Sequence, residues 1–199
     1  GARVLVTGGA GSRGSELILQ ALERGAGQVM ALDMAETPLH DLSLLAVTRL
    51  GEQATALDTR IGDVRNAEAT HRLLAEFQPD IVYHAAAYKH VPVMESQPME
   101  AWNTNVLGTV NFLQHARSCG THSFVLVSTD KAVNPSSVMG ASKRMAELLV
   151  QDASRQWPEC RWTMVRFGNV LDSSGSVIPL FREQLRLGQP LTVTHPEVT

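Results

Sequence analysis

The stretch Arg3-Val4-Leu5-Val6-Thr7-Gly8-Gly9-Ala10-Gly11-Ser12-Arg13-Gly14 decides the fold, because an apolar strand runs directly into a glycine-rich turn that opens a helix. Gly9, Gly11 and Gly14 have the spacing G-x-G-x-x-G. Asp33 ends the next apolar strand about 20 residues later, which completes a dinucleotide-binding fingerprint. Glycines here allow a tight turn and close approach of a pyrophosphate, which N–H groups at the helix N-terminus then bind. A P-loop is excluded because Ser15, and not lysine, follows Gly14. The candidate cofactor-binding residues of this stretch are Thr7, Gly8, Gly11, Ser12, Arg13 and Gly14.

Charged residues bear on which dinucleotide is bound. Asp33 would accept hydrogen bonds from an adenosine ribose and repel a 2′-phosphate, so NAD is favoured over NADP. Arg13 complicates this preference, since its guanidinium could offset pyrophosphate charge or tolerate the additional phosphate. Asp63 and Val64 follow the third expected strand as candidates for the adenine contact, although Asp63 could equally be the N-cap of the next helix.

Apolar runs alternate with helical patterns along the whole chain, which indicates βαβ units and a parallel sheet. Strands are expected near residues 3–7, 28–33, 54–60, 81–85, 123–128 and 161–167, and helices near 12–25, 37–50, 66–77, 98–119, 138–156 and 175–188. Strands that are apolar on both faces predict helices on each side of the sheet. We therefore expect an α/β, doubly wound parallel sheet of the Rossmann type.

The expected domain is a single NAD-binding unit over residues 1–199, in which 166–199 are the start of a substrate-binding portion. The chain stops at His195-Pro196-Glu197-Val198-Thr199 without a terminal helix, so we expect the C-terminal substrate region to be truncated. A net charge of -3 gives no reason to expect nucleic acid or an anionic membrane as a partner. Apolar runs of strand length predict no membrane contact from this segment and a cytoplasmic location.

Metal and disulfide chemistry are not expected. The two cysteines, Cys119 and Cys160, fit neither a disulfide framework nor a metal site, and the seven histidines show no metal-ligand spacing.

The middle of the chain contains Ser128-Thr129-Asp130-Lys131 after an expected strand and Met139-Gly140-Ala141-Ser142-Lys143 on the following helix. This is the layout of a short-chain dehydrogenase/reductase active site, in which the helix normally has Y-x-x-x-K. Met139 occupies the tyrosine position and cannot transfer a proton. Asp130 and Lys131, just past the strand, are the obvious replacements for the missing base.

Lysine is rare in this chain and lies only in its chemically suggestive middle. Of 17 basic residues, three are lysine, namely Lys89, Lys131 and Lys143, and the others are arginine. This usage indicates that lysine is kept at positions where a compact, titratable ammonium is needed.

Several motifs together resemble one branch of the extended short-chain dehydrogenases/reductases. They are Thr7–Gly14, His84-Ala85-Ala86-Ala87-Tyr88-Lys89-His90-Val91-Pro92, Ser128–Lys131, Asn134-Pro135, Met139–Lys143 and Arg166-Phe167-Gly168-Asn169-Val170. The branch is the polysaccharide-biosynthesis (CapD/WbpM-like) UDP-N-acetylglucosamine 4,6-dehydratases, and the resemblance covers essentially the whole chain. It implies NAD as cofactor, a UDP-sugar as substrate and a UDP-4-keto-6-deoxy sugar as product.

The resemblance also implies roles for individual residues. Thr129 would hydrogen-bond the C4 oxygen, Asp130 would protonate the departing C6 hydroxyl, and Lys131 would remove the C5 proton. Lys143 would hold the nicotinamide ribose, and Met139 would lie beside it on the same stripe of the helix. The remaining candidates are Ala85, Ala86 and Ala87 for the cofactor, Lys89, His90, Asn169 and Val170 for the substrate, and Asn105 for the backbone of the active site.

Two departures from the family pattern place charge near ligand phosphates. Arg13 replaces an apolar residue of the glycine loop, and Asp172 stands where glycine is usual.

Two other functions stay open. One is a nucleotide-sugar 4-epimerase, which the missing tyrosine base counts against, and the other is a non-catalytic NAD-binding module. We also expect a homo-oligomer, and the full-length protein is expected either in the cytoplasm or anchored at the inner membrane with this domain on the cytoplasmic side.

Overall fold

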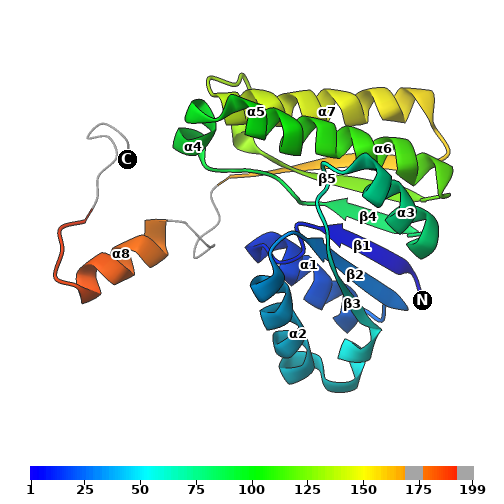
Figure 1. Ribbon diagram of the computed structural model, residues 1–199, viewed down its shortest axis with the longest axis horizontal. Helices are drawn as coiled ribbons and strands as arrows, with labels where there is room; N and C mark the ends of the chain where they lie inside the picture. Colours follow the sequence, from blue (N-terminus) through cyan, green and yellow to red (C-terminus); the bar gives the residue numbers. More distant parts are fainter. Residues whose placement is uncertain (169–176, 192–199) are drawn as a thin grey trace. The chain divides into compact units, whose positions relative to one another are not determined.

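The computed structural model describes residues 1–168 and 177–191 (Figure 1). It divides the chain into two compact units, Gly1–Arg166 and Phe167–Thr199. The first unit contains the sheet up to Arg166 and the helices that precede that residue. In the second unit, the described residues are 167–168, helix α8 (Val177–Arg186) and 187–191. The assignment of residues 166–199 to substrate binding stays a prediction.

Six strands form one sheet with the order β3-β2-β1-β4-β5-β6. They are β1 (Arg3–Thr7), β2 (Gln28–Asp33), β3 (Leu57–Ile61), β4 (Ile81–His84), β5 (Ser123–Thr129) and β6 (Arg161–Phe167). The pairs β1–β2, β1–β4, β2–β3 and β4–β5 are parallel, with Thr7 opposite both Leu32 and His84. The chain order reverses between β1 and β4, so the carboxyl ends of these two strands flank a crevice in which ligands of such sheets bind. The expected doubly wound α/β fold is confirmed.

Helices cover both faces of this sheet, as Figure 1 shows. One face carries α1 (Ser12–Glu23) and α2 (Glu36–Leu50), and the other carries α3 (Ala67–Phe77), α6 (Gly108–Ser118) and α7 (Val138–Gln156). The alternation of β1 explains the two cores, because Val4 and Val6 pack with α1 and α2, whereas Leu5 packs with the opposite helices. Two short helices, α4 (Val91–Ser96) and α5 (Pro98–Ala101), lie between β4 and α6.

The expected helix over residues 98–119 is wrong in one respect, because it is interrupted. Helix α5 is followed by a π-helical segment, Trp102–Leu107, and only then by α6. The side chain of Asn105 bonds outside the helix, and such demands commonly accompany π-type turns at functional sites. The third strand also starts later than expected, at Leu57, because a 3₁₀ helix occupies Gly51–Ala56. Helix α4 was not expected at all.

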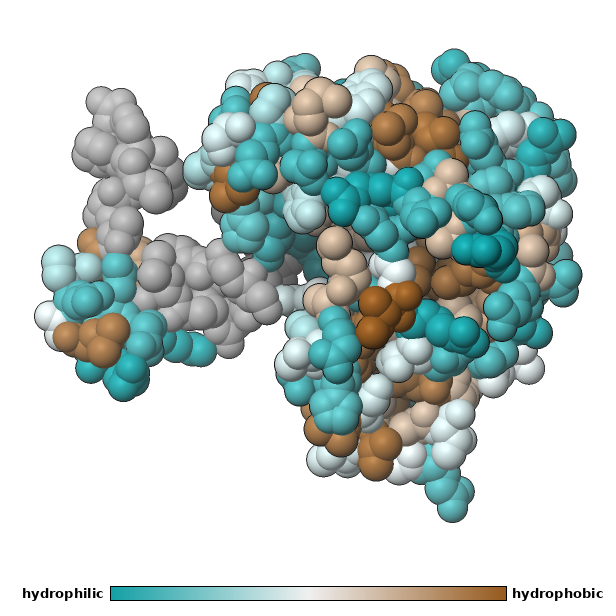
Figure 2. Space-filling view, in the orientation of Figure 1, coloured by the Kyte–Doolittle hydropathy of each residue, from teal (hydrophilic) through white to brown (hydrophobic). Residues whose placement is uncertain are grey.

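The described surface is that of an ordinary folded domain. Figure 2 shows a mainly hydrophilic face with separate hydrophobic patches, as expected when there is not enough polar surface to cover a core. Within residues 1–168 and 177–191, no helix combines the length and apolarity that a bilayer crossing requires.

Candidate active site

The glycine loop between β1 and α1 is built so tightly that two of its positions exclude a side chain. Gly8 has a φ of 67°, and a Cβ atom there would lie 2.7 Å from the backbone nitrogen of Ala86. A Cβ atom on Gly14 would overlap the carbonyl oxygen of Gly8. Gly11 differs, because a Cβ atom there would meet only the Gly8 oxygen, at 3.3 Å. The first two glycines therefore serve the packing of the loop, and Gly11 leaves its outer side open.

Thr7 and His84 join the glycine loop to the end of β4. The Thr7 hydroxyl lies 2.8 Å from Nδ1 of His84 and accepts a hydrogen bond of 3.2 Å from the backbone of Ala86. Burial, with a smaller effect of Lys143, lowers the pKa of His84 to about 3, so this ring is neutral. His84 is thus a structural residue that fixes the start of the Ala85–Ala87 loop.

Asp33 stands at the carboxyl end of β2 and already holds two loops. Its carboxylate accepts hydrogen bonds from the backbone of Ala10, at 3.0 Å, and of Ala35, at 3.1 Å. Two carboxylate oxygens offer about four acceptor positions, so capacity remains for ribose hydroxyls.

The loop fits a dinucleotide on three structural grounds. Its open side at Gly11 leaves space for a pyrophosphate, and Asp33 lies at the neighbouring strand end. The first hydrogen bond inside α1 runs from Ser15 back to Gly11. The N-terminus of α1 therefore follows the glycine loop directly, and the positive end of a helix dipole favours an anion there.

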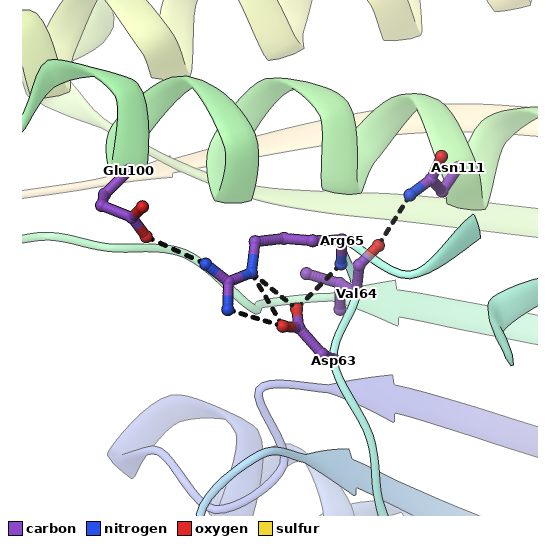
Figure 3. A network of polar contacts seen from close by, with 5 residues as sticks. All are labelled: Asp63, Val64, Arg65, Glu100 and Asn111. Atoms are coloured by element: carbon purple, nitrogen blue, oxygen red, sulfur yellow. Dashed lines mark hydrogen bonds and ion pairs between the residues drawn. The ribbon is translucent and has the colours of Figure 1, made fainter. Parts of the chain in front are cut away.

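Asp63 lies in a network of polar contacts at the end of β3 (Figure 3). Its carboxylate binds the guanidinium of Arg65, with a shortest distance of 2.6 Å, and Arg65 also reaches Glu100 of α5 at 2.9 Å. Hydrogen bonds from Arg65 lower the pKa of Asp63 despite the opposing effect of burial. The backbone oxygen of Val64 accepts a hydrogen bond from Asn111, which fixes this turn.

The alternative that Asp63 caps the next helix is wrong. The N-cap of α3 is Asn66, whose side chain accepts a hydrogen bond of 3.0 Å from the backbone of Ala69. Asp63 lies three residues earlier and turns to Arg65 instead. The adenine contact by Asp63 and Val64 stays a prediction.

The Thr129-Asp130-Lys131 segment forms a compact acid–base group at the carboxyl end of β5. The Thr129 hydroxyl donates to Asp130 at 2.9 Å, and Nζ of Lys131 donates to the same carboxylate oxygen at 3.2 Å. The bond from Thr129 is the main cause that lowers the pKa of Asp130, burial opposes it, and Lys131 adds to it. In this state Asp130 is an ionised carboxylate. Both charged side chains are reachable by a ligand, with 54% of Asp130 and 39% of Lys131 exposed.

Met139 occupies the tyrosine-equivalent position of α7 and is buried. It packs in a small cluster with Met94 and Ala101, against which Tyr88 is also placed. Next to it, a Cβ atom on Gly140 would overlap the carbonyl oxygen of Lys131. Glycine at this position therefore lets the start of α7 lie directly against the Asp130–Lys131 turn.

Lys143 is buried one helical turn after Met139 and donates a hydrogen bond of 2.7 Å to the carbonyl of Val127. Burial is the main cause that lowers the pKa of Lys143 to about 8, the Glu147 carboxylate opposes it, and Arg13 adds to it. In the described part of the chain, Val127 is its one hydrogen-bond acceptor, which leaves two of three N–H donors for a ligand.

Arg13 belongs to the same electrostatic group as two of the lysines. Burial lowers the pKa of Lys89, and the nearby charge of Arg13 lowers it further, as it does for Lys143. This side chain therefore adds positive charge between the glycine loop and the residues of α7.

His90 is exposed at the start of α4, where its side chain forms no cap. Asn169 and Val170 lie outside the described residues.

Asn105 joins the Tyr88 loop to α7. Its amide accepts from the backbone nitrogen of Tyr88 at 2.8 Å and donates to the Tyr88 oxygen and to the Ser142 hydroxyl. These contacts hold the Tyr88 loop against α7, and the role of Asn105 in an active site stays a prediction.

Sequence reasoning did not single out Glu147, which is fully buried beside Lys143. The signal was available, because a charged residue four positions after Lys143 lies on the same buried stripe of α7.

Within the described residues, no cluster of three or more histidine, cysteine or acidic side chains could hold a metal ion.

Comparison with known proteins shows the family of the chain. The family model described as "Polysaccharide biosynthesis protein" matches residues 4–199. The chain is 43% identical over 199 residues to the probable polysaccharide biosynthesis protein EpsC of Bacillus subtilis, and 44% identical over 196 residues to the capsular polysaccharide biosynthesis protein CapD of Staphylococcus aureus. It is 38% identical over 202 residues to a UDP-glucose 4-epimerase of Rickettsia canadensis. It spans 33% of EpsC and CapD and 57% of the epimerase, and the matches cover 98% or more of this chain.

Solved structures with a similar fold include the two that follow. Pen from Bacillus thuringiensis superposes with a TM-score of 0.88 at 34% identity, over 98% of this chain and 60% of that one. DesIV from Streptomyces venezuelae, a dTDP-glucose 4,6-dehydratase solved with NAD and TYD bound, superposes with a TM-score of 0.77 at 27% identity. That match covers 95% of this chain and 63% of DesIV.

Proposed function

This chain belongs to the polysaccharide biosynthesis protein family, and from that premise we propose that it carries the NAD-binding part and the acid–base groups of a nucleotide-sugar 4,6-dehydratase. The proposed substrate is UDP-N-acetylglucosamine, and the product is a UDP-4-keto-6-deoxy sugar. The matched relatives include proteins of polysaccharide biosynthesis, a 4-epimerase and, among the structures, a 4,6-dehydratase. Within this class, the choice of a dehydratase comes from the residues of the site.

The observation that carries the proposal is the Asp130–Lys131 pair at the end of β5. Elimination of water across C5 and C6 needs a base at C5 and an acid at C6, whereas epimerisation at C4 needs only one group that exchanges a proton with the C4 oxygen. Helix α7 has the buried Met139 where a tyrosine would serve that single purpose. An adjacent acid and base therefore favour elimination.

The ionic state of the pair suggests how it becomes reactive. When bound, NAD would supply the hydride acceptor for C4 and the hydride donor for C6. Substrate binding removes water from Asp130 and Lys131, and a drier site disfavours both charges. Transfer of the proton from Nζ of Lys131 to the Asp130 carboxylate, 3.2 Å away, produces a neutral amine and a neutral acid. Those are the forms that remove the C5 proton and protonate the C6 hydroxyl.

The remaining groups hold the reactants in place. Thr129 currently donates to Asp130, and turning its hydroxyl to the sugar C4 oxygen would release that carboxylate to accept a proton. The free N–H donors of Lys143 would bind the nicotinamide ribose. Lys89, near Arg13, would face the diphosphate of the substrate.

The chain should bind NAD more tightly than NADP. The Asp33 carboxylate already accepts two backbone N–H groups at the end of β2, so a 2′-phosphate placed beside it meets a fixed negative charge. We expect at least about tenfold weaker binding of NADP, equivalent to about 1.4 kcal/mol. Titration of the two cofactors by intrinsic fluorescence measures the difference, and Asp33→Asn is the control that should reduce it. Equal affinities in the original chain would mean that Arg13 outweighs Asp33.

The activity is tested by incubating the full-length protein with UDP-N-acetylglucosamine and following the sugar by NMR. A 4-keto-6-deoxy product supports the dehydratase. Formation of UDP-N-acetylgalactosamine without loss of water would instead establish the 4-epimerase, the alternative that the Rickettsia relative favours. Binding of NAD with no change in either sugar would leave a non-catalytic cofactor-binding module.

Two further properties of the full-length protein are proposals. Self-association is supported by an apolar hollow of about 360 Å³ between α5 and α7, whose rim includes the partly exposed Met99, Trp102 and Met145. Placement in the cytoplasm, or at the inner membrane with this domain on the cytoplasmic side, suits a substrate made from a soluble nucleotide.

A further inference from the structure

Glu147 is a fully buried carboxylate that the proposed chemistry does not use. It lies in the middle of α7 with 0% of its surface exposed, in the packing layer between that helix and the sheet. An isolated charge at such a position would cost several kcal/mol, so its partners must compensate it. They come from three different elements of the fold.

Three side chains donate four hydrogen bonds to the two oxygens of Glu147. Arg166 of β6 binds both of them, at 2.8 and 2.6 Å, in the two-pronged arrangement that guanidinium groups favour. Ser128, the residue before Thr129 on β5, donates to one oxygen at 2.7 Å, and Arg144 donates to the other at 3.0 Å. Burial would raise the pKa of Glu147, but the bonds from Arg166, Ser128 and Arg144 outweigh it and lower the pKa to about 2.

Glu147 follows Lys143 by four positions on α7 and both are buried, so the two side chains lie on the same stripe of the helix and the carboxylate acts on that ammonium. The other groups around that ammonium are the Arg13 guanidinium from α1, which is also positive, the neutral His84 of β4 and the Val127 carbonyl of β5. Burial and Arg13 both favour the neutral amine, and Glu147 alone among these charges favours the ammonium.

We propose that Glu147 is a positioning residue that keeps Lys143 charged in a dry site while it ties the ends of β5 and β6 to α7. Its tie to Ser128 holds the strand that leads into Thr129, Asp130 and Lys131. Its tie to Arg166 holds the strand end at which the first unit of the fold stops. The relation to Lys143 is a property of this chain in the absence of ligand, and only its consequence for catalysis rests on the proposed function.

The chain offers a direct measurement, because it contains just three lysines. Lysine labelled with ¹³C at Cε gives three signals, which Lys→Arg variants at positions 89, 131 and 143 assign. Titration of the unliganded protein then follows the charge of Lys143 by itself. We expect Glu147→Gln to lower the pKa of Lys143 by about one pH unit, the smaller end of what an opposite charge nearby produces. A folded Glu147→Gln protein with an unchanged Lys143 titration would overturn the proposal.

Arg166→Met is the matched variant, since it removes the main partner of Glu147 but leaves the carboxylate. A purely structural role predicts that both variants disturb Lys143 in the same way. The proposal predicts opposite signs, with the pKa of Lys143 unchanged or raised when the positive guanidinium is lost. A fall in Arg166→Met would overturn the proposal even if Glu147→Gln failed to fold. Circular dichroism confirms that each variant is folded, and the unchanged positions of the Lys89 and Lys131 signals confirm that the effect is local.

The consequence for catalysis is measured separately in the active full-length protein. If Lys143 must be charged to hold the ribose, Glu147→Gln should move the alkaline limb of the pH–kcat/KM profile to lower pH by the same amount as the NMR titration. Glu147→Asp retains the charge and should restore the limb. Loss of this kinetic effect alone, with the titration as expected, would contradict the proposed reaction and leave the role of Glu147 intact.

Discussion

Lys131→Ala is expected to stop exchange of the C5 proton of the sugar and to reduce turnover by about 10²–10⁴-fold. The amine of Lys131 is the proposed base at C5. Its hydrogen-bond partner Asp130, a carboxylate with a lowered pKa, is instead the proposed acid at C6. Asp130→Asn should have a different defect, because it leaves the base in place. It should still allow oxidation at C4 and exchange at C5 while it blocks the loss of water.

Deuterium incorporation at C5 from heavy water, measured in the full-length enzyme, separates these two defects. Met139→Leu is the control on the same site, since it replaces one buried apolar side chain by another of similar volume and should retain turnover within a few-fold. Rapid exchange in Lys131→Ala together with none in Asp130→Asn would reverse the two roles. Undiminished turnover in both variants would remove the dehydratase proposal.

Gly14→Ala should destabilise the first unit of the fold by about 3 kcal/mol or more. The added methyl group would overlap the carbonyl oxygen of Gly8, and both partners of that contact are backbone held by β1 and α1. Neither can move away without separating the helix from the sheet. Chemical denaturation measures the loss of unfolding free energy.

Gly11→Ala is the matched comparison, because its backbone conformation, φ -73° and ψ 159°, is open to alanine and its methyl group meets only one atom. Its stability should change by about 0.5–1 kcal/mol, as for other exchanges at a helix N-cap. Its defect should be in the cofactor, since the methyl group occupies the open side of the loop. NAD should raise the melting temperature of the original chain and fail to do so in Gly11→Ala. Equal stability of the two variants would show that the loop relaxes around Gly14.

Much of the candidate site could be predicted because its signals are local. The spacing of Gly9, Gly11 and Gly14 after an apolar strand, with Asp33 at the end of the next, requires no knowledge of long-range contacts. The same holds for the absence of tyrosine at Met139 and for the adjacent Asp130 and Lys131. The predicted helix bounds were wrong where a side chain forms hydrogen bonds with segments that are distant in the sequence. The amide of Asn105 bonds to Tyr88 and Ser142, and the helix expected over 98–119 is interrupted there.

By itself, the sequence determined the class of fold and the place of the glycine-rich loop. These depend on hydrophobic periodicity and on glycine, which act over a few neighbouring residues. Only the tertiary structure decided that Asn66 and not Asp63 caps α3, that Met139 is core, and which charges surround Lys143. Glu147, Ser128 and Arg166 are separated by up to 38 positions, and the sheet brings them within hydrogen-bond distance. The charge of a buried group depends on such neighbours, because water no longer screens it. The spacing of residues along the chain does not indicate which neighbours these are.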